Sequence, residues 1–333
     1  MKKRWSQYFL IAFLLIVCGC ANRGTTPYIF QGETQGTYYR ITYYADDSIV
    51  GKAKVEACLN DFLQTASLFE ENSIISKVNR NEPVALNSDF AEIFNVSKQV
   101  SQATGGAFDI TVGDLVKNWG FGYKANQELP EETVDSLLQF VGYQKVDIID
   151  EKVVKSDPRI KIDFNAIAKG YSVDVVAHLL ENANIENFIV DIGGEIYAKG
   201  AKPDGSAWNI GIEKPAADSN AERVVQTVIS VSNKAVATSG TYRKYREVDG
   251  VRYSHTIDPK TGYPVSHSLL SVTVVANSCA QADALATAFM VMGVEKAMVF
   301  LKDHPDFEAY FIFSDENGAW QTACTEGFRK LIL

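Results

Sequence analysis

One short segment, residues 255–264, gathers the side-chain types that acid–base chemistry and ligand binding use. Its sequence is His-Thr-Ile-Asp-Pro-Lys-Thr-Gly-Tyr-Pro, and it follows a strand-like stretch at 250–254. The prolines and the glycine exclude helix and sheet, so the polar side chains lie on a fixed loop at a strand end. Fixed polar loops on a scaffold often carry binding and catalytic groups. An ordinary surface turn remains the alternative, because the segment alone does not separate the two interpretations.

A carboxylate and a hydroxyl stand out in the small, apolar helical segment 282–287. Asp283 and Thr287 are four residues apart, a spacing that places both on one face of a helix. Hard cations such as Mg²⁺ bind oxygen ligands, usually one or two carboxylates together with phosphate and water. The pair is therefore a candidate Mg²⁺ site. Taken alone, however, a capping aspartate and a threonine bonded back to the helix backbone explain it better.

Another group of polar residues lies at 163–171, where a strand is expected to give way to a helix. A helix N-terminus presents free N–H groups to anions, and Asp163 could bind a ring nitrogen or a hydroxyl of a ligand. Lys169, one turn into the helix, could face a phosphate. The segment lacks the glycine-rich cradle and the Gly-Lys-Ser/Thr of a P-loop. An N-cap followed by a solvated lysine is an equally weighted alternative.

Two further segments combine glycines with carboxylates or aromatic side chains. Residues 191–195 end a strand with Gly193 and Gly194, which permit either a tight turn or the close approach of a ligand to the backbone. Residues 107–113 and 119–122 carry aromatic rings and glycines that could stack on a planar ligand. A turn and a set of core aromatics are the simpler interpretations of these segments.

The hydrophobic pattern predicts the elements that would position these residues. Helices are predicted over 51–69, 89–104, 165–181, 280–292 and 294–302 and around 134–141. The second of them is expected to begin with Asp89 and Glu92 as a capping box and to stop at Gly105-Gly106. Strands are predicted over 37–44, 146–149, 153–154, 160–164, 188–191, 208–212, 224–231, 269–275, 308–313 and 319–325. Strands outnumber helices without regular alternation. The predicted fold class is therefore α+β, with mixed or antiparallel sheets and packed helices in one two-lobed body.

The overall composition limits the function. The chain has 333 residues, of which 46% are hydrophobic and 22% are charged, enough for a large core and without a sign of disorder. Its net charge of −9 argues against nucleic-acid binding, which needs a basic surface.

The N-terminal residues form a predicted targeting segment. Three basic residues precede an apolar run, 8–18, that is too short to span a membrane. The run ends in Val-Cys-Gly-Cys, which resembles a bacterial lipobox with cleavage before Cys20 and a lipid such as palmitate on the mature end. We predict a signal peptide over 1–19, a lipidated Cys20 with a tether over 20–29, and a folded domain over 30–333. A plain secretory signal is the alternative.

Taken together, these segments resemble a known family. Gln-Gly-Thr-Tyr-Tyr at 35–39 and Ala-Phe-Asp at 107–109 occur in order with 163–171, 191–195, Ser239-Gly240, 255–264 and 283–287. This set resembles the ApbE family of bacterial FAD:protein FMN transferases over about residues 30–325. The resemblance is most specific at 255–264 and at the Asp283/Thr287 pair.

The resemblance implies an activity and a location. Members of the family split FAD at its pyrophosphate and transfer FMN to a Thr or Ser hydroxyl of a partner protein, releasing AMP. The implied acceptors are exported flavoprotein subunits of Nqr- and Rnf-type redox pumps. The implied location is the periplasmic side of the cell inner membrane, with the lipid on Cys20 as the anchor.

The resemblance also implies site residues, with Mg²⁺ as cofactor and FAD as substrate. Asp283 and Thr287 match the Mg²⁺ ligands, together with the backbone carbonyl of Ala166. His255 matches the residue near the scissile phosphate and is the expected base. The positions that match FAD-lining residues are Gln35, Phe69, Ala107, Phe108, Asp109, Asp163, Lys169 and Ile257.

Two alternatives stay open at the level of sequence. Water in place of the acceptor hydroxyl would make the same site an FAD pyrophosphatase that produces FMN and AMP. A lipoprotein that binds FAD without turnover is the other alternative, and the intact Asp283/Thr287 pair argues against it.

Overall fold

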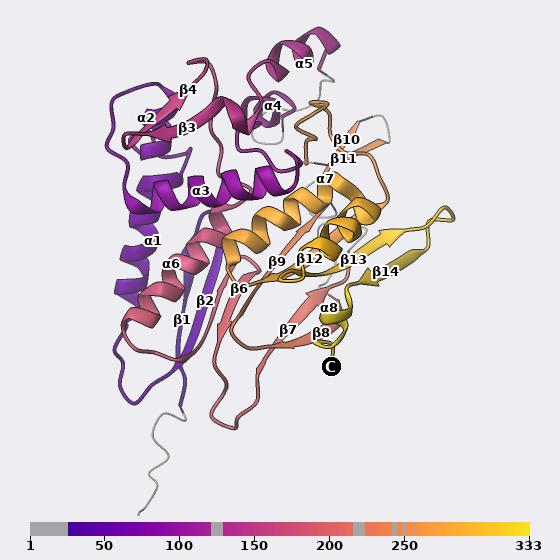
Figure 1. Cartoon of the computed structure of the whole chain (residues 1–333). Helices are drawn as coiled ribbons and strands as arrows, with labels where there is room; N and C mark the ends of the chain where they lie inside the picture. The colour runs from indigo at the N-terminus through magenta and orange to yellow at the C-terminus, as the bar shows by residue number, and fades with distance from the viewer. Residues whose placement is uncertain (1–25, 121–128, 216–223, 242–244, 249–250, 255) are drawn as a thin grey trace, which may run out of the picture.

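The computed structural model describes residues 26–120, 129–215, 224–241, 245–248, 251–254 and 256–333, which are arranged around one large β-sheet (Figure 1). Eight strands form this sheet in the order β1-β2-β5-β6-β9-β12-β13-β14, and every neighbouring pair is antiparallel. The predicted α+β class with antiparallel pairing is therefore confirmed. The strands are β1 (Tyr28–Thr34), β2 (Thr37–Tyr44), β5 (Asn187–Ile192), β6 (Glu195–Lys199), β9 (Lys234–Gly240), β12 (Leu269–Ala276), β13 (Glu308–Ser314) and β14 (Trp320–Cys324).

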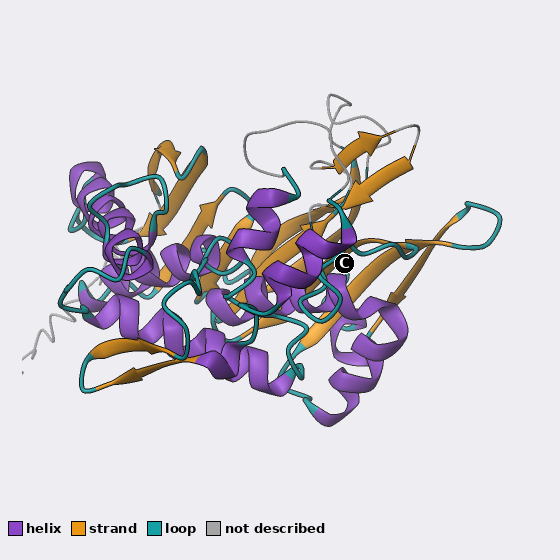
Figure 2. Cartoon of the chain, turned by 90° about the horizontal axis from the view of Figure 1, so that it is seen from above, coloured by secondary structure: helices purple, strands orange, loops and turns teal. Residues whose placement is uncertain are grey.

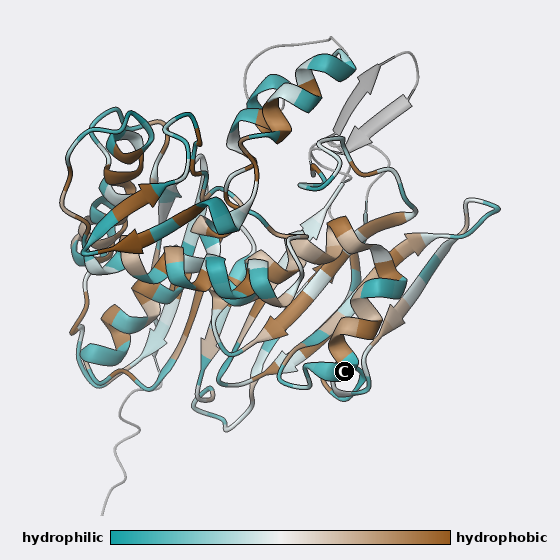
Figure 3. Ribbon diagram, turned by 45° about the horizontal axis from the view of Figure 1, so that its top comes forward, coloured by the Kyte–Doolittle hydropathy of each residue, from teal (hydrophilic) through white to brown (hydrophobic). Residues whose placement is uncertain are grey.

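Helices cover one face of the sheet (Figure 2). They are α1 (Lys52–Ala66), α3 (Ser88–Ala103), α6 (Ala168–Asn182) and α7 (Cys279–Asp303). The central helix, α7, packs on β9 and β12 and against α6. The apolar sides of these elements form the main core, which includes the fully buried Tyr39, Phe164 and Phe289. Figure 3 shows the result: α7 and the central strands are mainly brown, the colour of apolar residues.

The opposite face is covered by the hairpin of β7 (Trp208–Glu213) and β8 (Val225–Val231) and by the short helix α8 (Glu326–Arg329). A second core lies between these elements and the sheet and includes Trp208, Ile229 and Phe328. Because both faces of the sheet are covered, β12 is buried along almost its whole length instead of alternating between core and solvent.

Smaller elements complete the described chain. Helix α2 (Ile74–Asn79) lies next to the hairpin of β3 (Val146–Ile149) and β4 (Lys152–Lys155), to which Lys155 connects it. Helices α4 (Gly113–Asn118) and α5 (Glu131–Leu138) pack over a small apolar cluster that contains Leu115, Trp119, Val134 and Ile257. The short helix η1 (Tyr143–Lys145) precedes β3, and β10 (Tyr245–Val248) pairs with β11 (Val251–Ser254).

Most of the predicted elements occur, with shifted ends. The strand predicted over 37–44 is β2. The helices predicted over 280–292 and 294–302 both lie within α7. Gly293 breaks the helical geometry (φ 75°, ψ 170°) at the predicted boundary between them. The sequence pattern does not predict β1, β6 or β9. Strand β1 begins at Tyr28, so the last two residues of the predicted tether belong to the sheet.

Two local predictions are wrong. Residues 160–164, all described, form no strand, because the Ile162 N–H donates to the Asn79 side chain (2.7 Å) and the Asp163 N–H donates to the Ile110 carbonyl (2.7 Å). These partners lie at a helix end and in a loop, so no ladder can form.

The predicted capping box at the start of α3 is the second error. The N-cap is Asn87, whose side-chain oxygen accepts a hydrogen bond from the Phe90 N–H at 2.9 Å. Asp89 and Glu92 instead accept hydrogen bonds from the Tyr171 hydroxyl of α6.

By length and composition, α7 could cross a membrane, with a mean hydropathy of 1.7 over an 18-residue window. Half of that window is buried inside the protein, and the helix packs against the sheet, α3 and α6. This burial is typical of the core helix of a folded domain.

Candidate active site

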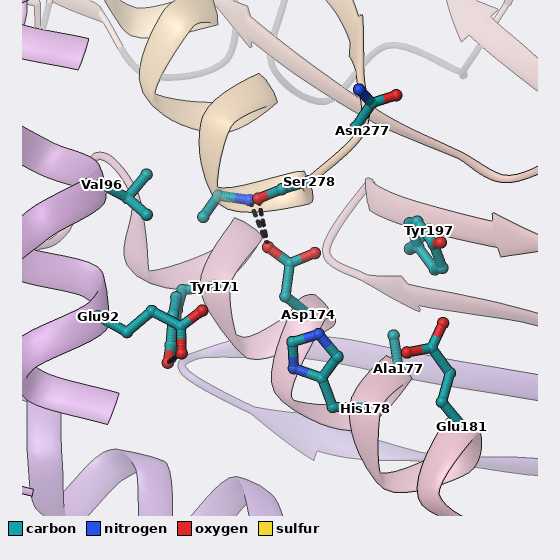
Figure 4. Close-up of a pocket in the computed structure, with 11 residues that line it drawn as sticks. Glu92, Val96, Tyr171, Asp174, Ala177, His178, Glu181, Tyr197, Asn277 and Ser278 are labelled. Carbon is teal, nitrogen blue, oxygen red and sulfur yellow. Dashed lines mark hydrogen bonds between the residues drawn. The ribbon is translucent and has the colours of Figure 1, made fainter. Parts of the chain in front are cut away.

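Helix α7 carries Asp283 and Thr287, and α6 supports its first turn. The Asp174 carboxylate of α6 accepts hydrogen bonds from the backbone N–H groups of Cys279 (2.8 Å) and Ala280 (2.8 Å) and from the Ser278 hydroxyl (2.9 Å). Such N–H groups lack partners inside a helix, so the aspartate fixes where α7 begins. Figure 4 shows Asp174 directed at this helix start, beside a cavity of about 160 Å³. No predicted site residue that the structure describes lines this cavity.

The first turn of α6 contacts Asp283 through its backbone. The Gly170 N–H donates to Asp283 Oδ2 at 2.9 Å. A Cβ atom at residue 170 would overlap the Cys279 carbonyl oxygen and lie 2.7 Å from the Asp283 Cβ, so the close approach of the two helices requires glycine. Gly170 is the third residue of α6, so its N–H is one of the donors at the helix start that have no partner inside the helix. Among the described residues, no backbone hydrogen bond ends on the carbonyl of Ala166, which precedes this helix start and is available for another partner.

Lys169 and Glu195 form a buried ion pair next to this contact. Lys169 Nζ lies against Glu195 Oε1, and the Glu195 side chain is 3% exposed. Glu195 Oε2 is buried and has no hydrogen-bond partner among the described residues. Burial, and then the Asp283 carboxylate, raise the pKa of Glu195 to about 7, although Lys169 opposes them. Burial also raises the pKa of Asp283, again against Lys169, so the three side chains form one electrostatic cluster.

The oxygen atoms that the family resemblance assigns to a cation are of the kind that a hard divalent cation binds. They are the Asp283 carboxylate, the Thr287 hydroxyl one turn later on α7, and the Ala166 carbonyl just before the start of α6. The Thr287 hydroxyl is 3.5 Å from the Ser239 hydroxyl of β9. The described residues contain no group of three or more His, Cys, Asp and Glu side chains that could hold a metal. A cation here would therefore use main-chain, hydroxyl, substrate and water oxygens, as Mg²⁺ usually does.

Two tight turns meet at the end of the sheet where Glu195 begins β6. In the turn between β1 and β2, Gln35 (φ 51°) and Gly36 (φ 69°) both adopt the left-handed conformation that a two-residue hairpin requires. In the turn between β5 and β6, the Gly193 N–H donates to the Tyr38 carbonyl at 3.0 Å. This bond joins the β5–β6 turn to the start of β2, so Gln35 and Glu195 lie at the same end of the sheet.

Polar atoms without partners gather at this end. Buried side-chain atoms that lack a hydrogen-bond partner, within the described part of the chain, are Thr34 Oγ1, Gln35 Nε2 and Glu195 Oε2. Buried polar groups are nearly always bonded, and each one left open costs about 1–3 kcal/mol. Their position at one end of the sheet indicates a binding site for a polar ligand.

The structure brings a second set of predicted residues together. The Asp163 N–H donates to the Ile110 carbonyl, which joins the segment around Asp163 to Ala107, Phe108 and Asp109. The buried Asp109 carboxylate accepts hydrogen bonds from the backbone N–H groups of Thr111 (2.8 Å) and Tyr143 (2.6 Å). Burial raises the pKa of both Asp109 and Asp163. The hydrogen bonds of Asp109 hold the loop in place, and contact of this set with FAD stays a prediction.

The remaining predicted residues are separated in the fold or lie outside the described residues. Ile257 is buried in the apolar cluster beneath α4 and α5. Phe69 follows α1 and is 70% exposed. His255 and Cys20, with the whole predicted signal peptide, lie outside the described residues.

Three residues that shape this site are not among the predicted site residues. Glu195 is the partner of Lys169, Gly170 contacts Asp283, and Asp174 supports α7. An acidic residue directly after a strand-ending glycine pair was the one signal for Glu195. No local pattern relates Gly170 or Asp174 to partners more than 100 residues further along the chain.

Similarity to known proteins identifies the family of the chain. The model of the ApbE family matches residues 35–311. The chain belongs to the ApbE family. A Haemophilus influenzae protein named FAD:protein FMN transferase is 36% identical over 347 residues, with 99% of each chain covered. A Vibrio cholerae protein of the same name is 39% identical over 297 residues, with 86% of this chain and 88% of that protein covered.

Solved ApbE structures agree with the fold. The flavin transferase ApbE from Vibrio cholerae has a TM-score of 0.81 at 34% identity, covering 92% of this chain and 99% of that chain. The apo form of the Pseudomonas stutzeri flavinyl transferase ApbE has a TM-score of 0.82 at 33% identity, covering 92% and 96%. The predicted ApbE family and the predicted enzyme class, a flavin transferase, are therefore confirmed.

Proposed function

We propose that this ApbE chain is a Mg²⁺-dependent FAD:protein FMN transferase. It would move FMN from FAD to a Thr or Ser hydroxyl of an exported flavoprotein subunit and release AMP. The observation that supports this most is the junction of α6 and α7, where the Gly170 N–H holds the Asp283 carboxylate and Lys169 lies close enough to stabilise its charge. An oxygen-rich cation site beside a lysine suits a pyrophosphate substrate. Relatives of this name that match the chain over most of its length support the same function.

The cation would be held by Ala166, Asp283 and Thr287. When bound, Mg²⁺ supplies positive charge against the negative charge that builds up on the pyrophosphate. Lys169 adds a second positive charge. Because Glu195 already fixes the Lys169 ammonium group, little reorganisation is needed when the nucleotide binds.

The transfer itself needs a base and a leaving group. The acceptor hydroxyl oxygen attacks the phosphorus on the FMN side, and a new P–O bond forms. The bond from that phosphorus to the AMP phosphate breaks, and its electron pair leaves with AMP. The hydroxyl proton passes to a base, for which we propose His255, since an imidazole titrates near neutral pH.

The nucleotide would extend over the sheet end where polar atoms lack partners. The Gln35 amide nitrogen there has a hydrogen to donate to an acceptor atom of the nucleotide. Phe69, Ala107, Phe108, Asp109, Asp163 and Ile257 complete the proposed lining. Their assignment rests on the family resemblance.

We also propose that the protein is exported and held by a lipid on Cys20 at the periplasmic side of the cell inner membrane. The support is the basic start, the short apolar run and the Gly-Cys step at its end. In this location it would meet exported subunits of Nqr- and Rnf-type redox pumps, the acceptors that the family resemblance implies.

Mass spectrometry tests this function. The purified protein from Ala21 on is incubated with FAD and Mg²⁺, with and without an exported flavoprotein subunit from the same genome. The proposal predicts an FMN-sized mass gain on a Thr or Ser of the subunit, equimolar AMP, and loss of both in EDTA. AMP and free FMN without labelling of the subunit would instead indicate an FAD pyrophosphatase, and intact bound FAD would indicate a binding protein.

A further inference from the structure

Glu195 is a buried carboxylate that the predicted site leaves out. It begins β6 directly after the Gly193-Gly194 turn, and it pairs with Ile192 of β5 in the ladder. Its side chain is 3% exposed. The sheet therefore holds this carboxylate inside the protein, at the end where Gln35 lies.

The two oxygens of Glu195 have different surroundings. Oε1 contacts the Lys169 ammonium group. Oε2 is buried and finds no hydrogen-bond partner within the part of the chain that the structure describes. A purely structural ion pair is expected to satisfy both oxygens, because a buried acceptor without a donor destabilises the fold. The open oxygen indicates that a ligand completes the arrangement.

Two adjacent residues of α6 connect Glu195 to Asp283. The Lys169 side chain pairs with Glu195, and the Gly170 N–H binds the Asp283 carboxylate. When both carboxylates are ionised, as in the titrations below at pH 8, the junction holds two negative charges against one ammonium group, an excess of one negative charge. Such a cluster repels an anionic pyrophosphate and attracts a divalent cation.

We propose that Glu195 is a positioning residue of the cation site, which holds Lys169 through Oε1 and supplies the second negative charge that draws a divalent cation to Asp283. The cation and the nucleotide therefore strengthen each other's binding. With the cation in place the cluster has an excess of one positive charge, and it then accepts the pyrophosphate. The inference rests on the proposed function, because it concerns the same cation and the same nucleotide.

The variant Glu195→Gln tests this role, because it keeps the shape of the side chain and removes its charge. Mg²⁺ and Mn²⁺ are titrated into the nucleotide-free protein at pH 8 by calorimetry, and FAD is titrated in EDTA by flavin fluorescence. We expect the Kd for the metal to rise by about 10–100-fold, the usual effect of a group that supports metal ligands. In EDTA, we expect FAD to bind to the Glu195→Gln variant at least as tightly as to the wild type.

The variant Lys169→Met changes the charge in the opposite direction. It should bind the metal more tightly and FAD in EDTA more weakly than the wild type. Glu195→Asp, which keeps the charge, should retain more of the metal affinity than Glu195→Gln. The exposed Glu316 in the turn between β13 and β14 provides the matched control, and Glu316→Gln should change neither affinity.

Other outcomes would overturn the proposal. Equal loss of both affinities in Glu195→Gln, or equal loss of metal affinity in Glu195→Gln and Glu195→Asp, would make Glu195 a structural residue only. Unchanged metal affinity in Glu195→Gln would remove it from the site. Failure of the nucleotide-free wild type to bind Mg²⁺ would overturn the role proposed for Glu195, whereas failure of the wild type to bind FAD even with Mg²⁺ present would contradict the proposed function itself.

Discussion

The Gly170 N–H, which has no partner inside α6, donates to the Asp283 carboxylate at 2.9 Å. The two residues are 113 positions apart, so this one contact joins the start of α6 to the second turn of α7. It orients the Asp283 carboxylate beside the first turn of α6. The proposed cation site therefore depends on the absence of a side chain at residue 170.

Replacing Gly170 by alanine should damage both the fold and the site. The added Cβ would lie 2.7 Å from the Asp283 Cβ, and neither helix can retreat without loss of packing. We expect the free energy of unfolding to fall by about 1–3 kcal/mol, as in other overpacked cores. FMN transfer should fall as well. Urea unfolding and the transfer assay measure the two effects.

Gly211 is the matched control for this substitution. A Cβ there would make an ordinary contact of 3.5 Å with Val225. Gly211→Ala should leave stability and transfer near wild type. Similar losses in both variants would show that the helix contact is not the cause.

Asp174→Ala should loosen the start of α7. The Cys279 and Ala280 N–H groups and the Ser278 hydroxyl lose their shared acceptor, and buried donors without partners cost stability. We expect the free energy of unfolding to drop by about 1–3 kcal/mol and Mg²⁺ affinity to fall. The exposed Asp204 caps only a surface turn, so Asp204→Ala should change neither Mg²⁺ affinity nor stability by as much. Undiminished Mg²⁺ binding by Asp174→Ala would mean that α7 keeps its position without this support.

The sequence predicts those parts of the fold and the site that depend on local pattern. Helical spacing places Asp283 and Thr287 on one face of α7, and Gly293 breaks the helix at the predicted boundary. The strand predicted over 37–44 also occurs, because its alternating β-branched and aromatic residues suit a half-buried sheet.

Contacts between residues that are distant in sequence cannot be predicted from local pattern. Lys169 and Glu195 meet only because β6 begins beside the end of β5, next to the first turn of α6. The segment 160–164 has a strand-like pattern, yet Asn79 and Ile110, which are distant in sequence, take its backbone N–H groups. In this segment, tertiary hydrogen-bond partners override the local β-propensity.

Lys155 should give stability a pH dependence at alkaline pH. Burial first, and Lys161 second, lower the pKa of Lys155 from 10.5 to about 8, although its ammonium group donates to the Val78 carbonyl and the Asn81 side chain. Between about pH 8 and 10.5 the folded protein therefore binds fewer protons than the unfolded chain, so the contribution of Lys155 to stability rises with pH. Below pH 8 it is charged in both states, and its burial lowers stability by a constant amount.

Urea unfolding between pH 7.5 and 10 measures this effect. The wild type should gain stability relative to Lys155→Met as the pH rises. The exposed Lys152 on the same strand is the control, and Lys152→Met should keep the wild-type pH slope. An identical slope in the wild type and Lys155→Met would contradict the lowered pKa.

Phe69 offers a test of the proposed nucleotide lining. Its ring is 70% exposed, so Phe69→Ala should change the free energy of unfolding by less than about 0.5 kcal/mol. If the ring stacks on the nucleotide, the Kd for FAD should rise by about three- to tenfold. Ile149, at 54% exposure on β3, provides a control that should not affect FAD binding. Unchanged FAD affinity in Phe69→Ala would exclude the ring from the site.

The most direct test of the proposed cation site compares the wild type with Asp283→Asn in the transfer assay, at saturating Mg²⁺ and FAD. The asparagine keeps the size of the side chain and an oxygen to accept from the Gly170 N–H, but it removes the charge that the cation needs. We predict that the variant folds, with an unchanged thermal transition or a raised one, and that the FMN mass gain on the acceptor falls at least about 100-fold. Transfer by Asp283→Asn at the wild-type rate, still abolished by EDTA, would place the cation elsewhere and contradict the cation site at Asp283.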